Sequence, residues 1–245
     1  MASSDVNSSR PNGAATSSYS TANGTVINLI GGFETLLWTL LARATDAVSL
    51  NPILDDHHAL KTISRVKDTG FKFRSSALGS IWAFLTRVVS VRSRSIDMIT
   101  EDFLKAHPKN AIILHLASAL DSRSMRVKWQ GEGKLWVDVD QEDVVELRKQ
   151  LIDPVNPGEG EYRLTGPNEY SEGWLTDLKI PGDRPVLIIM EGLSMYLSEA
   201  ENIANFKQLT QHFQYGGEIV FDVLGSFPVW AVNSVLPLFA IASLE

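Results

Sequence analysis

The sequence contains no cysteine among its 245 residues. Disulfide bonds and thiolate metal sites are therefore excluded, which fits a reducing compartment. Long apolar runs are also missing: the stretch FPVWAVNSVLPLFAIAS near the end of the chain is interrupted by Asn233 and Pro237. It is too short for a membrane-spanning helix, which takes about 20 apolar residues, so we expect no membrane partner.

Basic residues are few relative to acidic residues. The chain has 22 Lys and Arg against 29 Asp and Glu, which gives a formal net charge of −7. The local basic cluster consists of Arg87, Arg92 and Arg94. Because proteins that bind polyanions usually carry a basic patch or stripe, this composition argues against a nucleic acid partner.

Several short motifs of common enzyme classes are absent as well. The sequence has no G-x-S-x-G, no Walker phosphate loop, no H-E-x-x-H and no G-x-G-x-x-G. His57 and His58 stand beside Asp55 and Asp56, but adjacent residues do not converge on one ion without partners elsewhere. We interpret them as a polar entry to a helix and expect no metal site.

The first 25 residues, MASSDVNSSRPNGAATSSYSTANGT, are mostly Ser, Thr, Asn, Ala and Gly. Such a segment cannot bury enough apolar surface to offset its chain entropy, so we expect a disordered tail at 1–25. It also lacks the apolar segment of a secretory signal, which favours a cytoplasmic protein. We expect an N-terminal helical cap region over 26–109 and an α/β core over 110–245.

Helical spacing of apolar residues is found before residue 110. We expect a first helix within 25–47, where strong helix formers follow one another, and a second over 56–65 after the turn at Asn51-Pro52. A third helix is expected over about 80–106. It carries Arg92, Arg94 and Asp97 on its polar side.

After residue 110, apolar runs of strand length alternate with segments of helical period. The strand candidates are AIILHL, KLWVDVD, RPVLIIMEG and GEIVFDVLG, and the helix candidates are QEDVVELRKQLI and SEAENIANFKQLTQHF, the latter with Ser198 as its N-cap. We interpret 153–173, rich in Gly, Pro and acids, as a surface excursion. This alternation predicts the α/β class: a mostly parallel sheet with helices on both faces. Its ligand should lie beyond the carboxyl ends of the strands.

The turn after the first core strand reads Ala117, Ser118, Ala119, with Asp121 close behind, and Asp140 follows the next strand. In dinucleotide-type folds such a turn lets the backbone approach the ligand, and an acid about 20 residues on accepts hydrogen bonds from ribose hydroxyls. Two alternatives remain open. Asp140 also suits the N-terminus of the following helix. Ala117 and Ala119 are also ordinary small residues for a strand-helix junction. This alternative is supported by the resistance of alanine to the positive φ that glycine permits.

Two further polar residues belong to apolar strands. Glu191 ends the run PVLIIM, where a carboxylate is costly to bury without a partner. It therefore faces solvent or pairs with a cation, such as a ligand. His115 lies inside the strand candidate AIILHL, and we interpret it as a hydrogen-bonded core histidine.

Four blocks in this order carry a family resemblance: ETLLWTLLARATDAVSLNPILDDHHA, IILHLASALDSRSMRV, WVDVDQEDVVELRKQL and RPVLIIMEGLSMYL. They resemble the leucine carboxyl methyltransferase family, in particular its tetracenomycin-polyketide type of O-methyltransferase, over roughly residues 33 to 226. The resemblance implies a class I methyltransferase (Rossmann-like) fold with S-adenosylmethionine as methyl donor and a carboxyl or hydroxyl oxygen of a small molecule as acceptor. Family members usually continue through a helix and two antiparallel strands, so this chain is expected to lack those C-terminal strands.

The resemblance also implies roles for single residues. It places Arg43 and Arg92 near the carboxylate of the donor's methionine moiety, which suits their forked donors. It places Ala117 to Asp121 at the position of the family's glycine loop, Asp140 at the ribose, and Glu191 near the cofactor. Tyr196 is expected in the acceptor pocket. For Tyr196, a packed core aromatic with a wet hydroxyl is an equal alternative.

Three functions follow from these observations. The first is an S-adenosylmethionine-dependent O-methyltransferase acting on a small, polyketide-like secondary metabolite. The second is a catalytically impaired or truncated protein that keeps the fold and has lost cofactor affinity through its alanine turn and missing end. The third, a nicotinamide-dependent oxidoreductase, ranks last because the chain lacks both a Tyr-x-x-x-Lys pair and a G-x-G-x-x-G turn.

Overall fold

The computed structural model describes residues 17–20, 26–29, 33–69, 71, 73, 79–167 and 173–223. Its main feature is a five-stranded sheet in the order β5-β4-β3-β6-β7, and every neighbouring pair in it is parallel. The strands are β3 (Ile112–Leu116), β4 (Leu135–Val139), β5 (Glu161–Thr165), β6 (Val186–Met190) and β7 (Gly217–Phe221). Since β4 and β6 lie on opposite sides of β3, the strand order reverses there, and such a reversal creates a crevice at the carboxyl ends.

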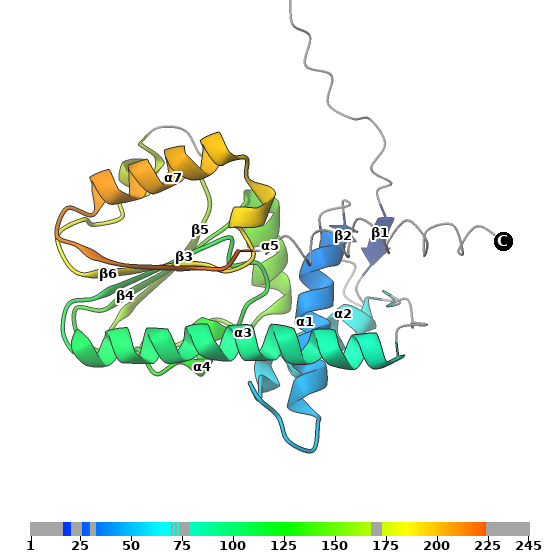
Figure 1. Ribbon diagram of the computed structural model, residues 1–245. Helices are drawn as coiled ribbons and strands as arrows, with labels where there is room; N and C mark the ends of the chain where they lie inside the picture. The colour runs from blue at the N-terminus through cyan, green and yellow to red at the C-terminus, as the bar shows by residue number, and fades with distance from the viewer. Residues whose placement is uncertain are drawn as a thin grey trace, which may run out of the picture.

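Helices cover both faces of this sheet, as predicted. Helix α3 (Gly79–Ala106) lies on one face and α7 (Glu199–His212) on the other (Figure 1). On the α3 face, Phe103 and Leu104 pack with Trp136 and Leu187. The opposite face, where Leu209 of α7 lies, also receives the short helix α6 (Trp174–Asp177). Sheet residues therefore alternate between two apolar layers, which explains the uninterrupted apolar runs in the sequence.

A third apolar cluster joins α1 (Phe33–Ala47), α2 (His57–Asp68) and α5 (Glu142–Leu151) at one end of the sheet (Figure 1). Helix α2 begins where expected, because the Asp56 carboxylate accepts a 2.9 Å hydrogen bond from the main-chain N–H of Ala59. Helix α1 contacts both α2 and α3. This packing places the N-terminal helices beside the crevice of the sheet.

The N-cap of α7 is also confirmed. Ser198 accepts a hydrogen bond from the main-chain N–H of Glu201, and the Glu201 side chain accepts one from the main-chain N–H of Ser198. This reciprocal pair is a capping box, and it satisfies two N–H groups that a helix start leaves without partners.

Three expectations need correction. Residues 26–29 are not helical, because Val26–Leu29 forms strand β2, which pairs in antiparallel fashion with β1 (Ser17–Ser20). Its Val and Ile favour strand over helix. Strand β1 lies inside the segment expected to be disordered, so that expectation is wrong for Ser17–Ser20. The other residues of that tail lie outside the described residues, and the proposed domain boundaries stay a prediction.

The third correction concerns the Gly- and Pro-rich section 153–173. It contains strand β5 (Glu161–Thr165), which pairs with β4. This strand is short, only partly buried and flanked by glycines and prolines, so its sequence lacks the apolar run that marks the other strands. The expectation of missing C-terminal strands falls on 224–245, outside the described residues.

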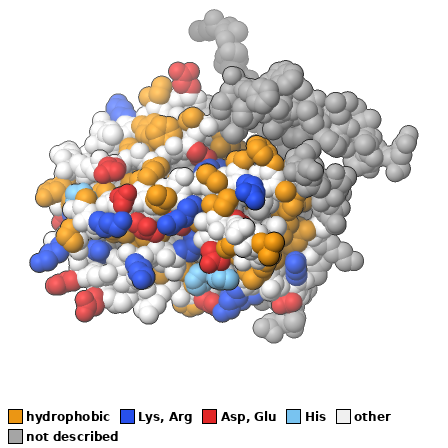
Figure 2. Space-filling model, turned by 60° about the horizontal axis from the view of Figure 1, so that its bottom comes forward, with side chains coloured by type: hydrophobic (Ala, Val, Ile, Leu, Met, Phe, Trp, Pro, Cys, Tyr) orange, Lys and Arg blue, Asp and Glu red, His pale blue; other side chains and the backbone are white. Residues whose placement is uncertain are grey.

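On the face that Figure 2 brings forward, Lys and Arg side chains are interspersed with Asp and Glu side chains and with hydrophobic ones. The exposed hydrophobic residues of α3 include Phe84, Val88, Val91 and Met98. Of the helices in the described part of the chain, none has the length and apolarity required to cross a bilayer.

Candidate active site

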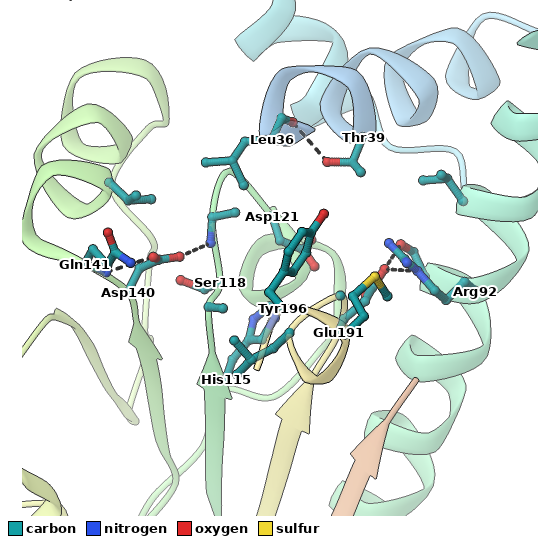
Figure 3. A pocket seen from close by; sticks show the side chains of 18 of the residues that line it. Leu36, Thr39, Arg92, His115, Ser118, Asp121, Asp140, Gln141, Glu191 and Tyr196 are labelled. Carbon is teal, nitrogen blue, oxygen red and sulfur yellow. Dashed lines mark hydrogen bonds and ion pairs between the residues drawn. The ribbon is translucent and has the colours of Figure 1, made fainter. Parts of the chain in front are cut away.

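A cavity of about 560 Å³ lies beyond the carboxyl ends of β3, β4 and β6. Its wall combines the segments that follow these strands with side chains from α1 and α3 (Figure 3). All nine residues singled out from the sequence line it: Arg43, Arg92, Ala117, Ser118, Ala119, Asp121, Asp140, Glu191 and Tyr196. The structure thus brings together residues up to 153 positions apart in the chain, while what each one binds stays a prediction.

The turn after β3 keeps a glycine-like shape without glycine. Ala117 has a φ of 51° and Ala119 a φ of 47°, both in the left-handed region. The alternative, in which Ala117 and Ala119 are ordinary small residues of a strand-helix junction, is therefore wrong, because both adopt the glycine-like conformation. Each left-handed alanine costs roughly 1–2 kcal/mol. Hydrogen bonds offset the strain, since the N–H of Ser118 donates to the Val139 carbonyl at 3.2 Å and Arg148 Nη1 donates to the Ala119 carbonyl at 2.8 Å.

Asp140 is tied to this turn. Its Oδ2 accepts a 2.7 Å hydrogen bond from the N–H of Ala119, and its Oδ1 accepts one of 2.8 Å from the N–H of Gln141 (Figure 3). Burial raises the pKa of the Asp140 carboxyl, and these main-chain donors only partly oppose the effect. Asp140 precedes Gln141, the N-cap of α5, and also lines the cavity, so its position suits both sequence interpretations, while its contact with ribose hydroxyls stays a prediction.

Ser118 supplies an unused polar atom in the cavity wall. Its side chain is buried, and its Oγ has no hydrogen-bond partner among the described residues. Because a buried polar group without a partner is costly, such an atom in a cavity wall fits a polar ligand.

Arg43 is buried and already engaged by the protein. Its Nη1 donates to Asp56 at 3.1 Å and to Asp121 at 3.0 Å, and its Nη2 donates to the Leu120 carbonyl at 3.0 Å. Three of its five N–H donors are thus occupied within the described part of the chain. Arg43 therefore fixes α1 against α2 and the turn, and it retains two donors for a ligand.

Arg92 is more accessible. Its Nε donates to Glu191 at 2.8 Å and its Nη1 to Asp222 at 2.9 Å, while its side chain keeps 29% of its surface exposed. Asp222 follows β7, and it also accepts a 2.6 Å hydrogen bond from the N–H of Gly192. The sequence interpretation missed Asp222, although it stands at a strand end within the quoted run GEIVFDVLG.

Glu191 pairs with cations, as one of the two sequence interpretations required, but these cations belong to the protein. Its Oε1 accepts from Arg92 and from Ser93 Oγ, each at 2.8 Å, and its Oε2 accepts from Arg123 Nη2 at 2.6 Å. Burial acts to raise its pKa, but the charges of Arg123 and Arg92 outweigh burial and lower the pKa to about 2. The carboxylate is therefore ionised throughout the physiological range.

A buried ionic network extends behind the cavity, and the sequence interpretation missed its centre. Arg123 Nε donates to Asp97 at 2.6 Å, and Arg126 Nε donates to the other oxygen of Asp97 at 3.0 Å. Asp97, expected on the polar side of α3, is buried. Arg126 further pairs with Asp56 at 2.7 Å. The available signal was Arg123, which stands two residues after Asp121 in the quoted block IILHLASALDSRSMRV.

His115 is confirmed as a core histidine. It is buried, and its Nδ1 lies 3.3 Å from Asp138 Oδ1 on the neighbouring strand. Asp138 also accepts from Arg148 at 2.7 Å and from the Trp136 indole at 2.8 Å. Burial opposes the ionisation of Asp138, but Arg148 leads the groups that lower its pKa. The His115 ring also forms part of the cavity wall.

The outer part of the cavity is apolar and aromatic. Leu36 of α1, Val89 of α3, and Leu193 and Met195 after β6 line this part, and all four are partly exposed. Tyr196 stands among these residues with 66% of its surface exposed, so it is not a packed core aromatic (Figure 3). The wall thus has a polar, charged inner part and an apolar outer part.

This fold and this site define a class of protein, an α/β enzyme of the class I methyltransferase type with a Rossmann-like parallel sheet. The family model of leucine carboxyl methyltransferases matches residues 37–210, and the chain belongs to this family.

Two relatives match over most of the chain. The S-adenosyl-L-methionine-dependent methyltransferase dpfgK of Gibberella zeae is 45% identical over 222 residues, which cover 89% of this chain and 74% of the relative. The tetracenomycin polyketide synthesis O-methyltransferase TcmP of Streptomyces glaucescens is 35% identical over 201 residues, which cover 82% of this chain and 69% of the relative. The chain is therefore a methyltransferase by family.

Proposed function

We propose that this protein is an S-adenosylmethionine-dependent O-methyltransferase that acts on a carboxyl or hydroxyl oxygen of a small, polyketide-like molecule. The observation that carries the proposal is the charge of the cavity wall. Four carboxyl groups and two guanidinium groups line it, and the described contacts pair both guanidinium groups with carboxylates. An excess of acid favours a cationic ligand. The names of the two relatives support the same donor and, for TcmP, an oxygen acceptor.

The same wall argues against a dinucleotide. A diphosphate usually binds at the N-terminus of a helix that follows the turn. Here the turn leads into α4, which spans only Arg123–Arg126 and is buried in the ionic network. The nicotinamide alternative therefore stays last.

The residues of the inner cavity fit the parts of the donor. Asp140 is assigned to the ribose hydroxyls, with Ser118 Oγ as a nearby free hydroxyl. Arg92 has three of its five N–H donors unused among the described contacts, so it is assigned to the donor's carboxylate with Arg43 as second contact. Glu191 and Asp121 supply negative charge for the donor's cationic groups.

When bound, S-adenosylmethionine supplies a methyl group on a positively charged sulfur. The chain's part in the reaction is to align the acceptor oxygen and to exclude water. A carboxylate acceptor needs no base. A hydroxyl acceptor has to lose a proton, and no base is assigned to that step, because His115, the histidine in the described cavity wall, is buried and paired with Asp138. The apolar outer part, with Tyr196, suits a flat aromatic acceptor.

The alternative is a protein that keeps the fold without cofactor affinity. Its main support in the sequence was the alanine turn, and that turn adopts the glycine-like conformation. We therefore rank the enzyme first.

Calorimetric titration with S-adenosylmethionine, with NADH as control, tests the donor. Micromolar binding of S-adenosylmethionine alone is expected. A folded, monodisperse sample that releases no heat would favour the impaired protein, and binding of NADH would favour the oxidoreductase.

The acceptor is tested with 3-hydroxy-2-naphthoic acid, which carries a carboxyl and a hydroxyl group on one aromatic frame. Mass spectrometry with fragmentation distinguishes a methyl ester from a methyl ether. Either product supports an O-methyltransferase, whereas methyl transfer to a carbon or to an added amine would contradict it.

A further inference from the structure

Arg123 is the residue at which two walls of the cavity are joined. It belongs to α4, directly behind the alanine turn, and its side chain has 0% of its surface exposed. It does not line the cavity itself, yet it contacts two carboxylates that do. Asp121 follows β3 and Glu191 follows β6, so the two acids come from neighbouring strand ends.

The contacts use the whole guanidinium fork. Nη2 donates a 2.6 Å hydrogen bond to Glu191 Oε2, and Nε donates one of 2.6 Å to Asp97 Oδ1. Nη1 lies 2.9 Å from Asp121 Oδ2 at an angle that makes no hydrogen bond, so this contact is an ion pair. Because the fork is planar and rigid, its three contacts fix the two cavity carboxylates relative to each other.

We infer that Arg123 is a positioning residue of the donor site, which orients the carboxylates of Asp121 and Glu191 toward the cationic part of the methyl donor. The inference rests on the proposed function, because it takes the ligand to be cationic. Asp97 anchors the fork from α3 and keeps it behind the cavity wall. Arg123 then acts through these acids and touches neither the donor nor the acceptor.

Arg123 also keeps Glu191 ionised. The groups that face Glu191 are Arg123 from α4, Arg92 and Ser93 from α3, and Asp121 from the segment after β3, while Asp222 after β7 engages Arg92. Burial and Asp121 raise the pKa of Glu191, and Arg123 opposes them most strongly. Loss of this guanidinium should therefore let Glu191 take up a proton at higher pH.

Arg126 provides a matched control. It is also buried and also pairs with Asp97 and Asp121, but no contact with Glu191 is found for it in the described structure. Replacing either arginine by methionine removes the same charge from the same network. If both arginines have a purely structural role, the two variants should lose donor affinity equally. If Arg123 is a positioning residue, the loss should be larger for the Arg123 variant.

The experiment titrates the full chain and the variants Arg123→Met and Arg126→Met with S-adenosylmethionine between about pH 5.5 and pH 8.5. At pH 8, Arg123→Met is expected to weaken binding by about tenfold, as loss of a hydrogen bond to a charged group implies. Relative to the parent, its affinity should fall further as the pH is lowered. Arg126→Met, which loses a contact with Asp121 but none with Glu191, should weaken binding less than Arg123→Met and should show no additional dependence on pH.

Two further variants sharpen the test. In Arg123→Met combined with Glu191→Gln, the additional pH dependence should vanish, because the group that titrates is gone. If the methionine variants do not fold, Arg123→Lys and Arg126→Lys take their place, since they keep the charge and lose the fork. The lysine pair should then show weaker donor binding for Arg123→Lys alone.

Equal losses and equal pH profiles for the two arginine variants would overturn the inference and leave the proposed function intact. Failure of the parent chain to bind S-adenosylmethionine would overturn the proposed function, and the inference with it. Binding by the parent with a selective loss in the Arg123 variant supports both.

Discussion

The main-chain N–H of Ala119 donates a 2.7 Å hydrogen bond to the carboxylate of Asp140, which lies 21 residues further along the chain. This bond joins the carboxyl ends of β3 and β4 through the turn that follows β3. Asp140 thus helps to hold the strained turn and also presents its carboxylate to the cavity.

Asp140→Asn should weaken the binding of S-adenosylmethionine by more than about 1 kcal/mol, because the amide replaces one acceptor oxygen by a donor. Asp143→Asn is the matched control. Asp143 also lines the cavity, but it is exposed and its side chain accepts a hydrogen bond from the N–H of Val144. Calorimetry measures the affinity of both variants for S-adenosylmethionine. An affinity of Asp140→Asn equal to that of the parent would remove Asp140 from the donor site.

The two left-handed alanines predict a gain in stability. Ala117→Gly and Ala119→Gly should each raise the free energy of unfolding by about 0.5–1 kcal/mol, because the relief of strain exceeds the larger entropy of glycine in the unfolded chain. Ala204→Gly, at an exposed position inside α7, should lower it by about 1 kcal/mol. Urea denaturation measures the free energy of unfolding of the parent and of the three variants. A loss of stability in the turn variants would show that both alanines are unstrained.

Tyr196 is expected to contact the acceptor and not the donor. Tyr196→Ala should raise the KM for 3-hydroxy-2-naphthoic acid about fivefold, as loss of an aromatic contact of about 1 kcal/mol implies. Tyr196→Phe should resemble the parent.

The control for this prediction is Tyr215→Ala. Tyr215 is exposed to 67%, against 66% for Tyr196, but it is not part of the cavity wall. The donor affinity should stay within about twofold in all three variants. An unchanged KM in Tyr196→Ala, or an equal rise in Tyr215→Ala, would argue against an acceptor contact.

Local sequence patterns predicted the elements that bury a continuous apolar run or carry a cap. Strands β3, β4, β6 and β7, and the helices that Asp56 and Ser198 cap, were found where the patterns placed them. Strand β5 was missed because Glu161–Thr165 is stabilised by pairing with β4 rather than by its own burial. The periodicity of apolar residues reflects burial. A half-exposed edge strand is little buried, so its sequence shows little of this periodicity.

The cavity was predictable where its residues follow strand ends, because parallel strands bring their carboxyl ends to one edge. The ionic network behind the cavity was not predictable. The contacts of Arg123 with Asp97 and with Glu191 join positions 26 and 68 residues apart, and no local pattern pairs charges at such distances. Similarly, the φ of Ala117 and Ala119 is set by tertiary hydrogen bonds against the local preference of alanine.

The last prediction concerns the dependence of stability on pH. Burial opposes the ionisation of Asp56, but Arg126 and Arg43 outweigh it and lower its pKa below the ordinary value. Since the folded pKa lies below the unfolded value of about 3.9, the stabilisation is fully present above pH 5 or so and is lost as the pH falls through the folded pKa. Asp56→Asn should therefore cost about 3–5 kcal/mol at pH 7, because it removes the carboxylate that Arg43 and Arg126 share and leaves one buried positive charge of the network uncompensated.

The difference in the free energy of unfolding between the parent and Asp56→Asn should be constant from about pH 5 to pH 8 and should shrink below about pH 4. The comparison cancels the opposite contribution of Asp140, whose pKa is raised in the fold. Asp102→Asn is the control, because the Asp102 side chain is 73% exposed and its ion pair with Lys105 lies on the surface. It should change stability by less than about 0.5 kcal/mol at any pH. A difference for Asp56→Asn that persists unchanged at pH 3 would mean that its stabilising contacts do not depend on the charge of the carboxylate.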